Sequence, residues 1–266
     1  STVAVDEKAR TVTFLGNKDA VLERHLYRTS IDRPGQVTRL SEPGWFHGAN
    51  GSGGRLIVTR SNPAQPPQTY LADANAKRLR WVNENKLDAS HPYTPYLASH
   101  QERTFGTLKT QDGATLHWEM IKPRMEPGKK YPVFFQHYGG PHVQTVARQW
   151  GGALQQYIVD RGYIWFQIDN RGKAFEDPIY HAMGGIEVRD QIAGAEWLKT
   201  QGFVDPNRIT TYGWSYGGYM TLKMLQAAPG MFAAGVSGAP VTKWELYDTH
   251  YTERYMGDPN TVADAY

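Results

Sequence analysis

Alternating apolar and polar positions characterise residues 1–88 of the chain. Short runs rich in β-branched and aromatic residues recur there, and turn residues such as those at 17–19 and 51–54 separate them. This two-residue period with regular breaks predicts β-strands rather than helices. The predicted strands span residues 10–15, 25–31, 36–40, 45–49, 55–60, 68–73 and 78–82.

The same stretch contains an internal repeat with a period near 43 residues. Thr13 and Ile57 lie 44 residues apart, and Tyr27 and Tyr70 lie 43 apart. A period of this length with about four strands per unit is typical of the blades of a β-propeller. A generic β-meander is the alternative. Since a closed propeller needs ~4–8 blades, we expect these to be the last two blades of a propeller that begins before this chain.

After residue 100 the pattern changes to that of an α/β protein. Residues 131–137 and 163–169 are nearly continuous apolar runs, which are typical of strands buried on both faces of a sheet. Helical patterns lie between the strands, and this alternation predicts a mostly parallel sheet. The predicted strands are 104–109, 115–121, 131–137, 163–169, 208–212 and 232–238, and the predicted helices are 147–161, 188–200 and the segment after residue 217. We therefore predict propeller blades at 1–88, a connector at 89–100 and an α/β domain at 101–266.

Composition narrows the function classes. The 29 Lys and Arg residues nearly balance the 26 Asp and Glu residues, and no long basic run occurs. This balance argues against a nucleic-acid groove or a membrane-binding patch, and no apolar stretch reaches the length of a membrane span. There is no cysteine, which excludes thiol catalysis and leaves the compartment open. His137 and His142 lack a nearby carboxylate cluster, so we expect no metal site and no cofactor.

The segment Gly213-Trp214-Ser215-Tyr216-Gly217 fits the pattern G-x-S-x-G. This pattern alone is weak, and an ordinary glycine-rich turn with an inert serine is the alternative. A β-prone run precedes it and a helical pattern follows it, which is the setting of a nucleophile elbow. Ser215 is therefore the predicted nucleophile, with free N–H groups of the following helix pointing toward developing negative charge.

An oxyanion needs two donors beside such a serine. One is normally the backbone N–H of the next residue, here Tyr216, and the other comes from a loop after an earlier strand. Residues 137–141, His-Tyr-Gly-Gly-Pro, follow a buried strand and match that loop in position. The Tyr138 hydroxyl is the predicted second donor. The alternative is that Tyr138 is a rim aromatic that packs beside a turn.

These motifs resemble the dipeptidyl peptidase IV branch of the prolyl oligopeptidase family. The resemblance covers the whole chain and rests on Tyr-Gly-Gly-Pro at 138–141, Gly-Trp-Ser-Tyr-Gly-Gly-Tyr at 213–219 and the aromatic segment at 244–257. It implies an α/β-hydrolase fold preceded by propeller blades, with Ser215 as nucleophile and Tyr138 and Tyr216 as oxyanion donors. It also implies a pocket for the penultimate residue of the substrate, lined by Tyr216, Val241, Trp244, Tyr247 and Tyr251. From spacing alone, the last three would be an aromatic core stripe on a helix.

Two elements of the family pattern are missing from these 266 residues. A triad on this fold runs Ser, Asp, His along the chain, but His250 is the sole histidine after Ser215 and Asp248 is too close to it to serve as the acid. No Glu-Glu pair is present to hold a substrate amine. We therefore expect the acid and the base to follow Tyr266, and we expect this stretch alone to be inactive.

The resulting hypothesis is a serine exopeptidase that releases Xaa-Pro or Xaa-Ala dipeptides from peptides with a free N-terminus. A broader oligopeptidase or esterase of the same superfamily is one alternative, and a catalytically dead binding protein is another. The resemblance also implies a homodimer of the full-length protein. Residues 169–172, Asp-Asn-Arg-Gly, are expected to form an anion-binding or site-shaping loop, and Glu176 and Asp177 a solvated pair.

Overall fold

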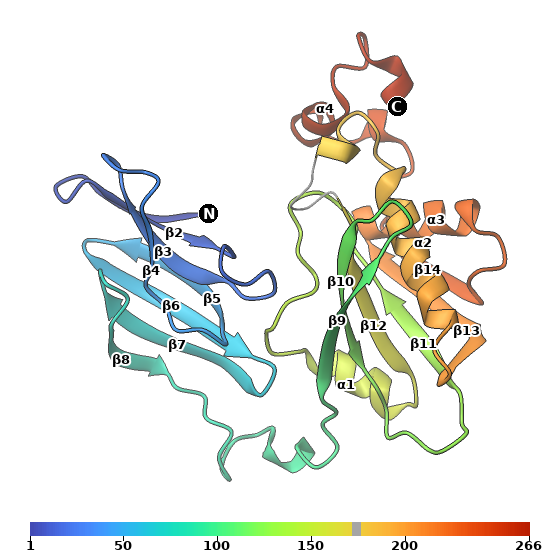
Figure 1. Ribbon diagram of the computed structural model, residues 1–266, viewed down its shortest axis with the longest axis horizontal. Helices are drawn as coiled ribbons and strands as arrows, with labels where there is room; N and C mark the ends of the chain where they lie inside the picture. Colours follow the sequence, from blue (N-terminus) through green and yellow to red (C-terminus); the bar gives the residue numbers. More distant parts are fainter. Residues whose placement is uncertain (172–176) are drawn as a thin grey trace. The chain divides into compact units, whose positions relative to one another are not determined.

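The computed structural model describes residues 1–171 and 177–266, which form two compact units (Figure 1). The first unit comprises Ser1–His100 with Ala147–Gly152, and the second comprises Gln101–Val146 with Ala153–Tyr266. The predicted division at residues 88 and 100 stays a prediction. Glu176 lies outside the described residues. Within the described part of the chain, no helix is long and apolar enough to cross a membrane.

The first unit consists of two antiparallel sheets of four strands each, and every strand pairs with its neighbours in sequence. The first sheet contains β1 (Thr2–Asp6), β2 (Thr11–Gly16), β3 (His25–Ser30) and β4 (Val37–Arg39). The second contains β5 (Phe46–Ser52), β6 (Arg55–Asn62), β7 (Gln65–Asp73) and β8 (Arg78–Asn83). All seven predicted strands are present. Strand β1 was not predicted.

The internal repeat has a structural counterpart in these sheets. Tyr27 on β3 lies opposite Phe14, and Tyr70 on β7 lies opposite Val58. Both tyrosines are buried and each occupies the third strand of its sheet. Two successive four-stranded meanders with one buried tyrosine at the same register position are the arrangement expected of two propeller blades.

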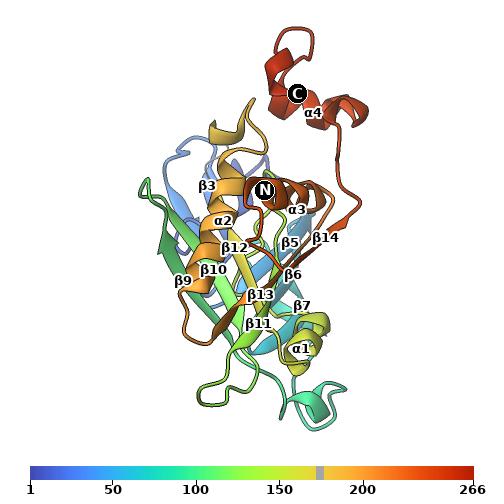
Figure 2. The same cartoon turned by 90° about the vertical axis from the view of Figure 1, so that its right-hand side faces the viewer.

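The second unit is built on a six-stranded mixed sheet of order β14-β13-β11-β12-β10-β9. Four strands run parallel, and β10 and β9 are antiparallel at one end. Helices α2 and α3 cover one face of the sheet and α1 lies against the other (Figures 1 and 2). The elements are β9 (Arg103–Lys109), β10 (Thr115–Ile121), β11 (Tyr131–Gln136), α1 (Ala153–Asp160), β12 (Ile164–Asp169), α2 (Ile186–Lys199), β13 (Val204–Trp214), α3 (Tyr216–Ala227) and β14 (Ala234–Gly238). The predicted α/β sheet is thus confirmed.

Burial on both faces explains why the central strands read as continuous apolar runs. On β12, Phe166 and Ile168 belong to the core beneath α2 and α3. Trp165, which immediately precedes Phe166 in the sequence, packs with Ile121 and with Val159 of α1 on the opposite face. Successive side chains of a strand point to opposite faces, so a strand with helices on both sides carries apolar residues on both faces.

The predicted helix at 147–161 is wrong in its first half, because only α1 (Ala153–Asp160) is helical. Residues 147–152 belong to the first unit, where the Arg148 N–H donates to the Leu22 carbonyl at 2.8 Å and the Trp150 ring stacks on His100 at 5.1 Å. Gly151 and Gly152 separate the two parts, and glycine is a poor helix former. Long-range contacts thus set the conformation of a segment whose local pattern is helical.

Two buried histidines predict an acid-sensitive fold. Burial lowers the pKa of His47, in the first unit, to about 4 and that of His137, in the second, to about 3. Because the unfolded chain binds these protons near pH 6.5, stability is fully present above that pH and is lost as pH falls toward the folded values. We expect the first unit to lose about 2 kcal/mol of unfolding free energy between pH 7 and pH 5 for His47, and the second unit to lose as much for His137. His25, a further buried histidine with a lowered pKa, adds to the loss in the first unit.

Hydrogen exchange resolved by peptide measures this loss separately in strands β6 and β11. His137→Gln keeps a polar group near Thr211, whose hydroxyl lies 2.8 Å from His137 Nε2. This variant is expected to flatten the pH dependence of the second unit and to leave that of the first unchanged. Equal pH slopes in the variant and the wild type would contradict the assignment to His137.

Candidate active site

Ser215 lies on the sharp turn between β13 and α3. Its φ is 58° and its ψ is −116°, and a non-glycine residue in such a conformation costs of order 1–3 kcal/mol. The Ser215 N–H donates to the Gly238 carbonyl at 2.9 Å, and the Ser215 carbonyl accepts from the Tyr219 N–H at 3.1 Å. Strand, strained serine and helix in this order have the geometry of a nucleophile elbow. The nucleophilic role of Ser215 stays a prediction.

Two glycines of the motif permit this close approach. A Cβ on Gly213 would lie 2.2 Å from the Gly217 carbonyl oxygen, and one on Gly217 would lie 2.7 Å from the His137 carbonyl oxygen. These contacts are with backbone atoms, which cannot turn aside as a flexible side chain can. The elbow therefore packs directly against the loop that follows β11, and this contact brings Ser215 near Tyr138.

All of the predicted site residues line one small pocket of about 20 Å³. They come from the loop after β11, from the elbow, from the segment after β14 and from two short helices, η3 (Trp244–Leu246) and α4 (Thr249–Met256). A volume of this size holds about one water molecule, so a larger group is admitted only if the lining moves. The lining residues are Tyr138, Ser215, Tyr216, Val241, Trp244, Tyr247 and Tyr251.

The aromatic residues of this pocket also pack as core. Trp244 is 5% exposed and belongs to the main core of the second unit. Its ring stacks on Tyr251 with the centroids 6.1 Å apart, and Tyr247 meets Tyr251 edge-on at 5.7 Å. The expected core packing and the predicted pocket wall are therefore the same group of side chains. The expectation of one helix is wrong, because Trp244 lies in η3, Tyr251 lies in α4 and Tyr247 has an extended backbone between them. Their roles in substrate binding stay predictions.

The Tyr138 side chain lies beside Tyr216, with ring centroids 5.9 Å apart. Burial raises the pKa of the Tyr138 phenol, and the neighbouring Tyr247 and Tyr255 add to the shift. The hydroxyl therefore stays protonated at neutral pH and is available as a donor. Tyr216 is the first residue of helix α3, and the N–H groups of a first helical turn have no partner within their helix. These two groups are the predicted oxyanion donors, and their role stays a prediction.

Glu187 was missed by the sequence analysis. It is fully buried in the first turn of α2 and accepts a hydrogen bond from the Tyr216 hydroxyl at 2.8 Å. Asn170 was considered only as part of a loop, yet its side chain donates to the Gly139 carbonyl at 2.9 Å, beside Tyr138. Acidic residues are common in the first turn of a helix because the helix dipole stabilises negative charge there. The position of Glu187 in the sequence therefore did not distinguish it from other such residues.

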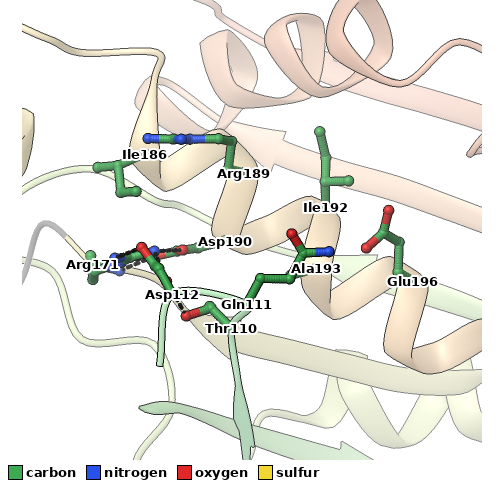
Figure 3. Close-up of a pocket in the computed structure, with 10 residues that line it drawn as sticks. All are labelled: Thr110, Gln111, Asp112, Arg171, Ile186, Arg189, Asp190, Ile192, Ala193 and Glu196. Atoms are coloured by element: carbon green, nitrogen blue, oxygen red, sulfur yellow. Dashed lines mark hydrogen bonds and ion pairs between the residues drawn. The ribbon is translucent and has the colours of Figure 1, made fainter. Parts of the chain in front are cut away.

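A larger hollow of about 310 Å³ lies beside α2 and the β9–β10 turn (Figure 3). Arg171 lies between two carboxylates there, with its guanidinium 2.6 Å from Asp112 and 2.7 Å from Asp190. The hydrogen bond from Arg171 lowers the pKa of Asp112 to about 2. Arg171 thus ties the turn to the helix and is already paired with two anions. Gly172, the last residue of the predicted loop at 169–172, lies outside the described residues.

His250 and Asp248, the two residues that could be a local base and acid, lie at the start of α4. His250 is exposed in the first turn of α4. Asp248 caps that helix, because its carboxylate accepts the Tyr251 N–H at 2.9 Å. An N-cap of this kind satisfies a free donor at the start of the helix. Asp248 therefore has a local structural role.

The fold and the elbow define an α/β-hydrolase, and comparisons with known proteins agree. Residues 150–266 match the model of the prolyl oligopeptidase family, and residues 1–67 match that of the dipeptidyl peptidase IV N-terminal region. The chain is 36% identical to dipeptidyl peptidase 8 of Mus musculus, covering 100% of this chain and 31% of the relative. It is 37% identical to the probable dipeptidyl-aminopeptidase B of Emericella nidulans, covering 99% of this chain and 30% of the relative.

A solved structure is also similar over the whole chain. The crystal structure of Porphyromonas gingivalis dipeptidyl peptidase 4 matches with a TM-score of 0.89 and 31% sequence identity, covering 100% of this chain and 38% of that one. The chain belongs to the prolyl oligopeptidase family, in its dipeptidyl peptidase IV branch. It spans about a third of the length of the curated relatives it matches. The resemblance and the fold class, α/β-hydrolase preceded by propeller blades, are thus confirmed.

Proposed function

We propose that the protein containing this chain is a serine dipeptidyl aminopeptidase that acts on peptides with a free N-terminus and prefers proline or alanine as the penultimate residue. The observation that carries this proposal is the aromatic pocket that adjoins Ser215. Flat aromatic walls favour a compact, rigid prolyl ring and leave little room for a larger side chain. In this proposal residues 101–266 form the catalytic domain and residues 1–88 contribute propeller blades.

The reaction proceeds through an acyl-enzyme. The Ser215 hydroxyl attacks the carbonyl carbon of the penultimate residue, and its proton passes to a histidine base supplied from outside these 266 residues. The Tyr138 hydroxyl and the Tyr216 N–H donate to the oxyanion that forms. Collapse of this intermediate releases the shortened peptide, whose new amine takes up the proton, and water then attacks the acyl-enzyme to release the dipeptide.

Access to the pocket requires its outer wall to move. Tyr247 is the most exposed lining residue, at 44%, and its ring meets those of Trp244 and Tyr251 edge-on. We expect its ring to turn outward when a prolyl ring enters. Because Trp244 and Tyr216 are buried, they form the fixed part of the wall.

A substrate panel with Pro, Ala, Leu or Phe at the penultimate position tests the proposal on the full-length protein. We expect cleavage after Pro and Ala, and a kcat/KM roughly 100-fold lower for Phe than for Pro, because the larger ring does not fit between the aromatic walls. Equal kcat/KM for Phe and Pro would instead favour a broader peptidase. No cleavage and no fluorophosphonate labelling of Ser215 would favour a binding protein.

Assembly is a separate proposal. The family resemblance implies a homodimer, and we propose this assembly for the full-length protein. Light scattering on the full-length protein measures its mass directly. A monomeric mass at micromolar concentration would remove this part of the proposal and leave the peptidase activity untouched.

A further inference from the structure

We propose that Glu187 is a positioning residue for the reaction, which acts through Tyr216 to hold the aromatic wall and the oxyanion donors in place. Glu187 touches neither the pocket nor the reacting atoms, and it lies 28 residues before Ser215 in the sequence. The inference rests on the proposed function, since it concerns the same site. It adds a buried carboxylate on helix α2 to a site otherwise built from loops, α3 and α4.

The contact between Glu187 and Tyr216 is fully buried. Glu187 is 0% exposed and Tyr216 is 2% exposed. The Tyr216 hydroxyl donates to Glu187 Oε1 at 2.8 Å, and burial together with Glu187 raises the pKa of this phenol, so it stays protonated. A hydrogen bond from a hydroxyl to a buried carboxylate is stronger than one between neutral groups. The Tyr216 ring is therefore held at its far end as well as at its backbone.

The surroundings of Glu187 suit a carboxylate. Besides Tyr216, the backbone N–H of Gly184 donates to Oε1 and that of Gly185 donates to Oε2 at 3.1 Å. All three partners are donors, and together they supply both oxygens. Burial raises the pKa of Glu187, and these hydrogen bonds oppose the shift. Glu187 therefore acts as a hydrogen-bond acceptor. Of its three donors named above, two are backbone N–H groups and the third is the phenol of Tyr216.

A displacement of the Tyr216 ring would reach both parts of the site. The ring lies 5.9 Å from that of Tyr138 and 5.7 Å from that of Trp244. The packing is tight, because a Cβ on Gly140 would lie 2.7 Å from the Tyr138 ring and 2.8 Å from the Tyr216 ring. One residue thus joins the phenol donor to the pocket wall, and its own N–H is the other predicted donor. Glu187 fixes that residue.

The experiment compares three variants of the full-length protein. Tyr216→Phe keeps the ring and removes the hydroxyl, Glu187→Leu removes the acceptor, and Glu187→Gln keeps one oxygen that can accept from Tyr216. We expect roughly 10-fold lower kcat/KM on an Xaa-Pro amide for Tyr216→Phe and for Glu187→Leu, the factor that corresponds to one hydrogen bond to a charged group. Glu187→Gln is expected to stay within about 3-fold of the wild type.

The double variant Glu187→Leu with Tyr216→Phe separates positioning from a general structural role. If Glu187 acts through the Tyr216 hydroxyl, the double variant loses no more activity than Glu187→Leu alone. Losses that multiply in the double variant overturn the proposal, as does a wild-type kcat/KM for Tyr216→Phe. The last result is decisive even if Glu187→Leu does not fold. Glu196→Leu makes the same change on the exposed side of α2 and should leave kcat/KM within about 2-fold.

The rate of Ser215 labelling by a fluorophosphonate is measured on the same set. It depends on the serine and its oxyanion donors and not on the dipeptide preference. If the wild type labels but cleaves no dipeptide substrate, the proposed function fails while the labelling rates still test Glu187. If the wild type cleaves and the variants show the wild-type pattern in both assays, the positioning role alone fails.

Discussion

Ser215→Ala is expected to lower kcat/KM of the full-length protein on an Xaa-Pro amide by roughly 10⁴- to 10⁶-fold, the largest effect of any single substitution in this chain. The strained turn presents one hydroxyl at the pocket, and without it no acyl-enzyme can form. The measurement is steady-state kinetics together with the intact mass after fluorophosphonate treatment. The wild type should gain one adduct and the variant none.

Ser90→Ala is the matched control for this substitution. Ser90 is exposed, and its hydroxyl donates to the nearby Asp88 at 2.7 Å. The control should retain the wild-type kcat/KM and the wild-type adduct. Retained cleavage in Ser215→Ala would remove Ser215 from the mechanism, and an adduct on another residue would move the nucleophile elsewhere.

Tyr138→Phe is expected to lower kcat by ~10²- to 10³-fold with little change in KM, the usual cost of one oxyanion donor. The phenol ring remains to pack against Tyr216, so the change removes a donor without opening a cavity. Because burial raises the pKa of Tyr138, the hydroxyl is a neutral donor throughout the range in which the enzyme would be assayed. Steady-state kinetics at pH 7 to 8 measure the effect.

Tyr163→Phe makes the same chemical change at the opposite end of the parallel strands. Tyr163 comes just before β12, whereas Ser215 follows β13, and these strands run in the same direction in the parallel part of the sheet. The control should leave kcat unchanged. An unchanged kcat in Tyr138→Phe, with an unchanged melting temperature, would show that the second oxyanion donor is another group.

Local sequence patterns were sufficient to predict those segments whose conformation depends mainly on neighbouring residues. The alternation on strands of the first unit, the apolar runs of β11 and β12 and the strand-turn-helix around Ser215 are visible without tertiary information, because burial on one or two faces dictates the period of side chains. β1 was missed because Thr2–Asp6 is a short run at the start of the chain, with no turn before it to mark its boundary.

The arrangement of the site residues was predicted only by resemblance. Spacing placed Trp244, Tyr247 and Tyr251 on one side of a helical segment, but a core stripe and a pocket wall have the same spacing. The structure brings them to Ser215 and Tyr138 through the ends of neighbouring strands. No local sequence pattern indicates which loops come together at the ends of the strands.

The sequence by itself determined most of the elements and the turn that carries Ser215, because these depend on residues close to one another in the chain. It also showed the repeat of the propeller blades, because similar residues recur about 43 positions apart. Only the tertiary structure decided that residues 147–152 leave the helix to join the first unit and that Glu187 reaches Tyr216. Both outcomes depend on partners far along the chain. A hydrogen bond or a stacking contact there outweighs the few tenths of a kcal/mol by which local propensities differ.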